Sequence, residues 1–135
     1  MNVKEELNNL RETFMLFEDP KDKFVQLMDM AKQSPDLNIS EKNDMSKING
    51  CTSQAWVVVN SNNDGTFTIR ADSDALIVKG LLTILEIIFS NKAVDEVLST
   101  NSQDILNSIG LENVITNQRT NGFSNAIEKI HGLIR

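Results

Sequence analysis

Residues 55–89 read AWVVVNSNNDGTFTIRADSDALIVKGLLTILEIIF and contain the clearest signals of the fold class. Residues 55–59 are a run of β-branched and aromatic side chains, which is typical of a strand. Residues 66–71 alternate between apolar and polar side chains, which predicts a second, half-buried strand. The pair Asp64-Gly65 lies between the two runs and suits the positive φ angles of a tight hairpin turn. The sequence therefore predicts a small antiparallel sheet in the middle of the chain.

The end of the same stretch, residues 75–89, predicts a helix that is apolar on almost every side. Such a helix is buried on most of its faces, so we expect it at the centre of the fold. Lys79 and Glu86 interrupt it, and it is too short to cross a bilayer. We interpret Ser73 as its N-cap and Asp74 as an acid of its first turn, where the helix dipole favours negative charge.

Apolar side chains at helical spacing predict further helices on both sides of the hairpin. Their expected ranges are 3–17, 20–32, 94–98, 103–109 and 121–133. Asp19 and Pro20 suit the N-cap and first position of a helix, and Gly110 suits a helix end. In the last helix we expect Leu133 to face inward.

Helices, then a small antiparallel sheet, then helices indicate an α+β fold rather than an α/β fold. Residues 36–46 are polar and predict a surface loop, and residues 46–48 suit a short third strand that leads into Cys51. The chain has 135 residues, enough to bury a sizeable core, and we expect residues 1–135 to form a single domain.

The composition argues against several classes of partner. The net charge is −6 and the isoelectric point is about 4.7, so the chain lacks the basic surface that binds nucleic acid or anionic membranes. The first residues are acidic where a secretory signal would be basic. We therefore expect a cytoplasmic protein in a reducing compartment, where a free thiol is ordinary.

Cys51 is the only cysteine. One thiol cannot form an intramolecular disulfide or supply the paired thiolates of a zinc knuckle or an iron–sulfur ligand set. A lone cysteine is more often a small buried hydrophobic residue than a reactive group. Here, however, Gly50 precedes it and the polar residues Thr52, Ser53 and Gln54 follow. This pattern favours a thiol on a loop beside a strand, where another protein can reach it.

Little in the sequence would activate this thiol. The nearby cation is Lys47, and Lys79 or Arg119 would have to approach through the fold, so we expect at most a modest lowering of its pKa. The single histidine, His131, would allow a Cys–His pair, but a solvated histidine near a helix end is the better interpretation. Asp72 and Asp74 are explained more simply as caps than as an acid–base pair.

We therefore expect neither a metal site nor a phosphate-binding glycine loop, because the chain has one cysteine, one histidine and scattered glycines. The residues describe an α+β domain with one accessible thiol. That profile fits a carrier or a redox sensor better than a self-contained enzyme.

Separated blocks of sequence then allow a more specific interpretation. The blocks are I-x-G-C-x-S-Q-x-W at 48–56, D-S-D-A-x-I-V-K-G-L at 72–81, G-L at 110–111 and R-x-N-G at 119–122. In this order and spacing they resemble the SufE/CsdE family of cysteine desulfurase partners, and the resemblance covers essentially the whole chain.

The resemblance implies a function. Members of this family accept a sulfane sulfur from the persulfide of a SufS/CsdA-type desulfurase, which uses pyridoxal phosphate. They carry the sulfur on a cysteine, pass it to an iron–sulfur scaffold complex and accelerate the desulfurase. The resemblance also implies a fold similar to IscU-type scaffolds, no cofactor or metal of the protein's own, and a monomer or homodimer.

The resemblance also assigns roles to residues. Cys51 is implied to be the sulfur acceptor, and the loop that presents it comprises Gly50, Thr52, Ser53 and Gln54. Arg119 matches the arginine of the family's 116–122 stretch, and we expect it to brace the cysteine loop or to contact the desulfurase. Asp74 is expected to frame the same surface.

Two residues depart from the family pattern. Thr52 stands where the family often has glutamine, and Asn117 where it often has proline. Either change would affect loop mobility or partner choice, but neither removes the thiol.

Sulfur transfer between cysteines is attack of a thiolate on a sulfane sulfur, so it needs one nucleophile, access and a docked partner. A persulfide also needs protection from reductants and oxidants. We therefore expect Cys51 to lie against apolar side chains at rest and to swing out on docking. A thiol-based redox sensor that uses Cys51, and an interaction protein with an inert cysteine, remain as alternatives.

Overall fold

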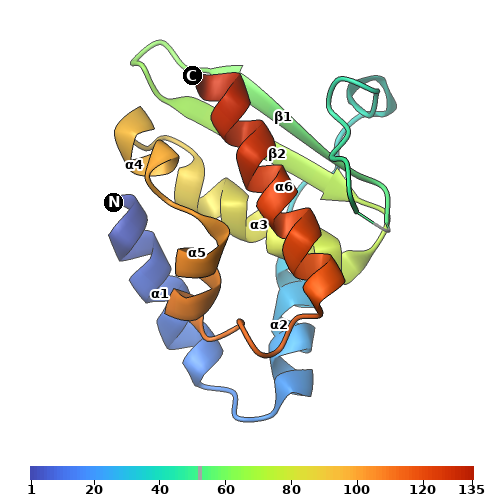
Figure 1. Ribbon diagram of the computed structural model, residues 1–135, viewed down its shortest axis with the longest axis vertical. Coiled ribbons are helices and arrows are strands. Elements are labelled where there is room, and N and C mark those ends of the chain that lie inside the picture. The colour runs from blue at the N-terminus through green and yellow to red at the C-terminus, as the bar shows by residue number, and fades with distance from the viewer. Residues whose placement is uncertain (52) are drawn as a thin grey trace.

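The computed structural model describes residues 1–51 and 53–135 and has an α+β fold (Figure 1). The helices and strands follow one another as expected from the sequence. Their bounds are α1 Val3–Met15, α2 Pro20–Gln33, the short 3₁₀ helix η1 Ile39–Glu41, β1 Ala55–Ser61, β2 Phe67–Ser73, α3 Leu76–Phe89, α4 Val94–Leu98, α5 Ser102–Ile109 and α6 Asn117–Ile134. In Figure 1 the hairpin lies at one end of the molecule and the α1–α2 connection at the other.

The hairpin forms as predicted. β1 and β2 pair antiparallel, with Val57 opposite Ala71, and Gly65 in the turn has a φ of +85°. The expected third strand is shorter than predicted, because Lys47 forms only an isolated bridge with Trp56. Backbone hydrogen bonds from Ile48 N–H to the Ala55 carbonyl (2.8 Å) and from Val57 N–H to the Ser46 carbonyl (2.9 Å) fix this segment beside β1.

Helix α3 is the centre of the fold, as its apolar sequence predicts. It contacts α2, β2, α1 and α6, and most of its side chains are buried. Gly80 permits a close contact with α2, because a Cβ there would clash with the Leu27 backbone. None of the helices formed by the described residues combines the length and the hydropathy that a bilayer span requires.

The predicted start of this helix was wrong. Ser73 is the last residue of β2, Ala75 occupies the N-cap position without a side-chain hydrogen bond, and α3 begins at Leu76. Pairing of Ser73 with Ala55 extends the strand through the expected cap. Asp72, also expected to be a cap, is instead buried, with Lys79 (3.4 Å) and Lys42 (3.2 Å) at its carboxylate.

Helix α6 differs from the prediction in three respects. It begins at Asn117, because the Thr116 hydroxyl accepts a hydrogen bond from Arg119 N–H (3.3 Å) and caps an earlier turn. Leu133 is half exposed rather than inward, since Ile130 and Ile134 fill the core side of the last turns. His131 is buried rather than solvated, and its Nε2 lies 2.8 Å from the Val97 carbonyl oxygen of α4.

Candidate functional site

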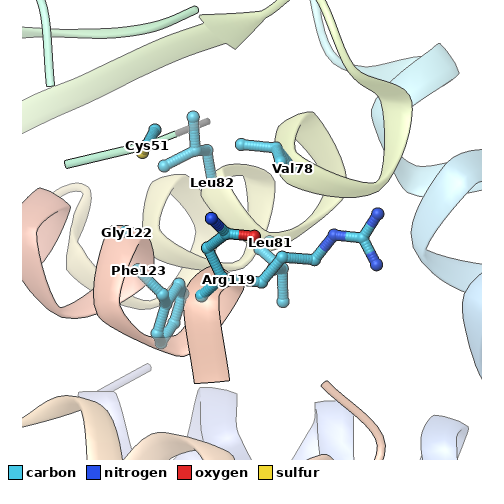
Figure 2. A pocket seen from close by; sticks show the side chains of 8 residues that line it. Cys51, Val78, Leu81, Leu82, Arg119, Gly122 and Phe123 are labelled. Carbon is cyan, nitrogen blue, oxygen red and sulfur yellow. The ribbon is translucent and has the colours of Figure 1, made fainter. Parts of the chain in front are cut away.

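Cys51 lies at the edge of a small apolar pocket (Figure 2). The thiol is half buried and belongs to the loop that connects the Lys47 bridge to β1. Helices α3 and α6 supply the rest of the lining, which consists of Val78, Leu81, Leu82, Gln118, Arg119, Gly122 and Phe123. The expectation that Cys51 rests against apolar side chains is confirmed.

Gly122 provides the space for the sulfur. A Cβ atom at this position of α6 would lie 2.7 Å from Cys51 Sγ, which is closer than the two atoms can approach. The absence of a side chain on this turn of the helix therefore lets the thiol sit directly against it. Gly122 belongs to one of the family blocks, but its contact with Cys51 could not be predicted, because the spacing of the two residues along the chain does not reveal it.

The N-terminal end of the cysteine loop is fastened to α6. The side-chain amide of Asn125 donates a hydrogen bond to the Asn49 carbonyl oxygen at 2.9 Å. Gly50 follows with a φ of +84°, and a Cβ there would clash with the Asn125 amide. The glycine is therefore favoured by its backbone angle, and its missing side chain leaves room for the Asn125 amide. The role of Asn125 as an anchor of this loop was not predicted from the sequence.

The C-terminal end of the loop is fastened to the connection between β2 and α3. Gln54 N–H donates to the Asp74 carboxylate at 3.1 Å, and Asp74 N–H donates back to the Gln54 carbonyl at 3.1 Å. The Ser73 hydroxyl also donates to the Gln54 carbonyl, at 2.8 Å. Asp74 thus lies beside the cysteine loop, as the resemblance implied, and holds its last residue in place. The expectation that it stands in the first turn of the helix was wrong, because it precedes the N-cap Ala75.

Burial raises the pKa of the Cys51 thiol. The group is therefore a protonated thiol at neutral pH, in agreement with the sequence expectation that the fold does little to activate it. Lys79 is engaged elsewhere, since its ammonium group pairs with Asp72 and Asp36. A thiolate would have to form when a partner changes the surroundings of this loop.

The comparisons with known proteins agree with one another. The SufE family model, described as an Fe–S metabolism associated domain, matches residues 8–134. The chain belongs to the SufE family. SufE-like proteins of Rhizobium meliloti and Rhizobium etli are 30% and 28% identical to it over 92% of this chain, which covers 91% and 86% of their own lengths. Membership associates the chain with iron–sulfur metabolism.

A solved structure of similar fold supports the architecture. The solution structure of a hypothetical protein from Thermus thermophilus has a TM-score of 0.78, covers 96% of this chain and is covered over 93% of its own length. Because the two sequences are only 17% identical, this likeness concerns the fold alone.

The resemblance also placed Thr52 and Ser53 in the cysteine loop. Thr52 lies outside the described residues. Ser53 is half buried in the same loop. The structure therefore places Gly50, Cys51, Ser53 and Gln54 together beside α6 and the start of α3.

Arg119 lines the pocket but does not point toward the sulfur. In Figure 2 its guanidinium group extends away from Cys51. Its backbone N–H bonds to Thr116, and among the described residues its guanidinium makes no hydrogen bond to the cysteine loop. Bracing of the cysteine loop by Arg119, or contact with the desulfurase, therefore stays a prediction.

His131 is separated from the thiol. The turn of α6 that contacts Cys51 is at Gly122, about 13 Å along the helix from His131. The histidine ring lies against Phe89 instead, with ring centroids 6.1 Å apart. Over the part of the chain that the structure describes, no three metal-binding side chains gather into a candidate ion site.

Proposed function

We propose that Cys51 accepts a sulfane sulfur from the persulfide of a SufS/CsdA-type cysteine desulfurase and passes it to an iron–sulfur scaffold complex. The observation that carries this proposal is the position of the chain's one thiol, half buried over an apolar pocket in a SufE-family fold. The protein would act as a sulfur-transfer accessory of the desulfurase rather than as a self-contained enzyme.

The transfer step needs only one nucleophile from this chain. The Cys51 thiol loses its proton, and the thiolate attacks the outer sulfur of the donor persulfide. A new S–S bond forms on Cys51 while the donor's S–S bond breaks. The electron pair of the broken bond stays on the donor cysteine, which leaves as a thiolate. No external oxidant or reductant enters the step.

The pocket supports the holding of a persulfide between donor and recipient. Its lining by Val78, Leu82 and Phe123 offers contacts to a second sulfur atom and limits the approach of water. A persulfide kept against such side chains is less open to small reductants than one in solvent. We expect the loop to leave this pocket when the donor docks.

The partners follow from this role. Pyridoxal phosphate belongs to the desulfurase, so this chain needs no cofactor for its own step. Arg119 lines the pocket with its guanidinium directed away from Cys51, and we expect it to contact the docked desulfurase. The acidic composition and single thiol favour a cytoplasmic location. Whether the carrier works as a monomer or a homodimer does not alter this step.

The experiment combines the protein with a cysteine desulfurase, pyridoxal phosphate and L-cysteine, followed by intact-mass measurement. We expect the chain to gain the mass of one sulfur atom and the Cys51→Ser variant to gain none. Faster turnover of the desulfurase with wild type than with the variant is the second expected result.

The redox-sensor alternative is tested in a parallel sample. Treatment with peroxide in place of desulfurase would give a sulfenic acid on Cys51 if oxidation were the function. Stoichiometric oxidation without sulfur uptake in the first sample would replace the carrier proposal with the sensor. A chain that takes up neither atom would be an interaction protein with an inert cysteine.

A further inference from the structure

The chain contains two Asn-Gly pairs that both lie at the thiol. Asn49-Gly50 directly precedes Cys51, and Asn121-Gly122 places its glycine against Cys51 Sγ. In an Asn-Gly pair the glycine nitrogen can attack the asparagine side-chain amide, because glycine has no Cβ to obstruct the approach. The same dipeptide thus occurs twice beside one sulfur, in two different backbone settings.

The two settings differ in their freedom to react. Asn49 is exposed and belongs to a turn, and Gly50 has a φ of +84°. Asn121 and Gly122 lie inside α6, where the Gly122 N–H is held by the helical hydrogen bond to the carbonyl four residues earlier. Attack by that nitrogen would require the helix to open, whereas attack by the Gly50 nitrogen requires only a rotation within a surface turn.

We propose that Asn49 is a site of spontaneous deamidation and that the isoaspartate product releases the Cys51 thiol from its pocket. The Gly50 nitrogen bonds to Asn49 Cγ and gives up its proton, and the amide nitrogen leaves as ammonia. The resulting succinimide adds one water. Opening at Cγ gives aspartate, and opening at the main-chain carbonyl gives isoaspartate. In both cases the Gly50 nitrogen regains a proton, and no electron is transferred to an outside group.

The isoaspartate product changes the anchor of the loop. Its main chain passes through Cγ and is one carbon longer, and the former main-chain carbonyl becomes part of the free carboxylate. That carbonyl oxygen is the one that accepts the Asn125 hydrogen bond at 2.9 Å. Cys51 Sγ lies so close to Gly122 that an added Cβ would be 2.7 Å from it, so a change in the length or anchor of the loop disturbs this fit. The longer loop therefore lifts the sulfur out of the pocket.

The added charge acts in the opposite direction but more weakly. A carboxylate at residue 49 disfavours a thiolate on Cys51, yet residue 49 is exposed and the two charges would interact largely through water. Loss of the pocket removes the burial that raises the thiol pKa. The net expectation is a more reactive thiol.

The first experiment follows the modification itself. The purified reduced protein is kept at mildly alkaline pH, and each deamidation adds about one mass unit because an amide becomes an acid. Peptide analysis should locate the change at Asn49, with aspartate and isoaspartate forms, while Asn121 in the same digest stays unchanged. The Asn49→Ser variant should keep its mass at this site. An intact Asn49, or an Asn121 that converts equally fast, would overturn the proposal.

The second experiment tests the effect on the thiol and needs no desulfurase, so it is independent of the proposed function. The isoaspartate form is separated, and its rate of alkylation at Cys51 is compared with those of fresh protein and the Asn49→Asp variant. The variant carries the same charge without the extra carbon. We expect the isoaspartate form to react severalfold faster and the variant to resemble fresh protein. Equal rates for all three would refute release of the thiol.

Discussion

Two neighbouring loops precede β1, and the structure holds them in very different ways. The loop at residues 34–46 is fastened along its length by charged groups. Leu37 N–H donates to the buried Asp72 carboxylate at 3.0 Å, and Glu41 forms a two-bond pair with Arg70 at 2.6 and 2.9 Å. In the cysteine loop at residues 49–54, the hydrogen bonds of the described residues lie at its two ends.

The two loops therefore have different roles: the first holds a strand in position and the second presents the thiol. The loop at residues 34–46 ends at Ser46, whose carbonyl accepts a hydrogen bond from Val57 N–H. This hydrogen bond fixes the position of β1. The cysteine loop rests between its anchors on apolar contacts with α3 and α6. Such contacts shelter a thiol without directional bonds, and a loop with few bonds opens at low free-energy cost. Variants in the two loops test this contrast.

Replacing Asp72 should give the largest effect. Asp72→Ala leaves the buried Lys79 ammonium without its buried partner and removes the acceptor of Leu37 N–H. Removing one partner of a buried ion pair costs about 3–5 kcal/mol, so denaturant unfolding should show a decrease of that order in the free energy of unfolding. Glu41→Gln, which weakens the more exposed pair with Arg70, should cost much less.

The contribution of Asp72 to the free energy of unfolding should depend on pH. Burial raises the pKa of Asp72, but hydrogen bonds from Leu37 N–H and Lys42 and the charge of Lys79 outweigh it, so the net pKa is lowered. A lowered pKa contributes stability above the unfolded value of about 3.9 and loses it as the pH falls through the folded value. The gap in stability between wild type and Asp72→Ala should therefore narrow in acid. A stability difference that stays constant as the pH falls would contradict an Asp72 carboxylate that is ionised in the folded protein.

In the cysteine loop, Gly122→Ala should change reactivity more than stability. The new Cβ would meet Cys51 Sγ at 2.7 Å, and the loop can yield because the hydrogen bonds of its described residues lie at its two ends. We expect severalfold faster alkylation of Cys51. Unfolding should change little, since alanine favours a helix by about 1 kcal/mol over glycine and offsets part of the crowding. Gly132→Ala, where nothing lies near the added Cβ, is the control and should leave alkylation unchanged.

The pH profile of alkylation should show the effect of the pocket on wild type. Burial raises the thiol pKa, so the midpoint of the rate–pH curve should lie above that of the denatured chain, which is expected near 8.5. The Gly122→Ala midpoint should move toward the denatured value. A folded midpoint below the denatured one would mean that a cation, and not burial, governs the thiol.

The smallest effect is expected at the C-terminal anchor of the loop. Asp74→Ala removes the acceptor of Gln54 N–H, an exposed hydrogen bond worth about 1 kcal/mol or less. Alkylation of Cys51 should rise less than in Gly122→Ala. Asp64→Ala removes a similar carboxylate-to-backbone bond, from Thr66 N–H in the hairpin turn, and should not alter alkylation. Equal reactivity of the two variants would show that Asp74 does not restrain the loop.

Local signals in the sequence predicted most of the fold. Asp19-Pro20 begins α2, Gly110 ends α5 with a φ of +77°, and Asp64-Gly65 forms the turn of the hairpin. Each of these depends on the backbone of adjacent residues, which local composition describes well.

Predictions failed where distant residues decide the outcome. Asp72 and Ser73 are residue types typical of a helix cap. In the structure Ser73 pairs with β1 instead, and Asp72 forms an ion pair with the buried Lys79. The thiol itself was identified from its neighbours and from the family resemblance. The contacts of Cys51 with Gly122 and of Asn49 with Asn125 join segments that are far apart in sequence. A single sequence contains no spacing that predicts such contacts.

The most direct test of the account follows one sulfur atom from donor to acceptor. A cysteine desulfurase is loaded with a single persulfide, freed of L-cysteine and mixed with this protein, and both intact chains are weighed over time. We expect the desulfurase to lose the mass of one sulfur atom as this chain gains it on Cys51, while Cys51→Ser gains none. A desulfurase that keeps its sulfur in the presence of folded wild-type protein would contradict it.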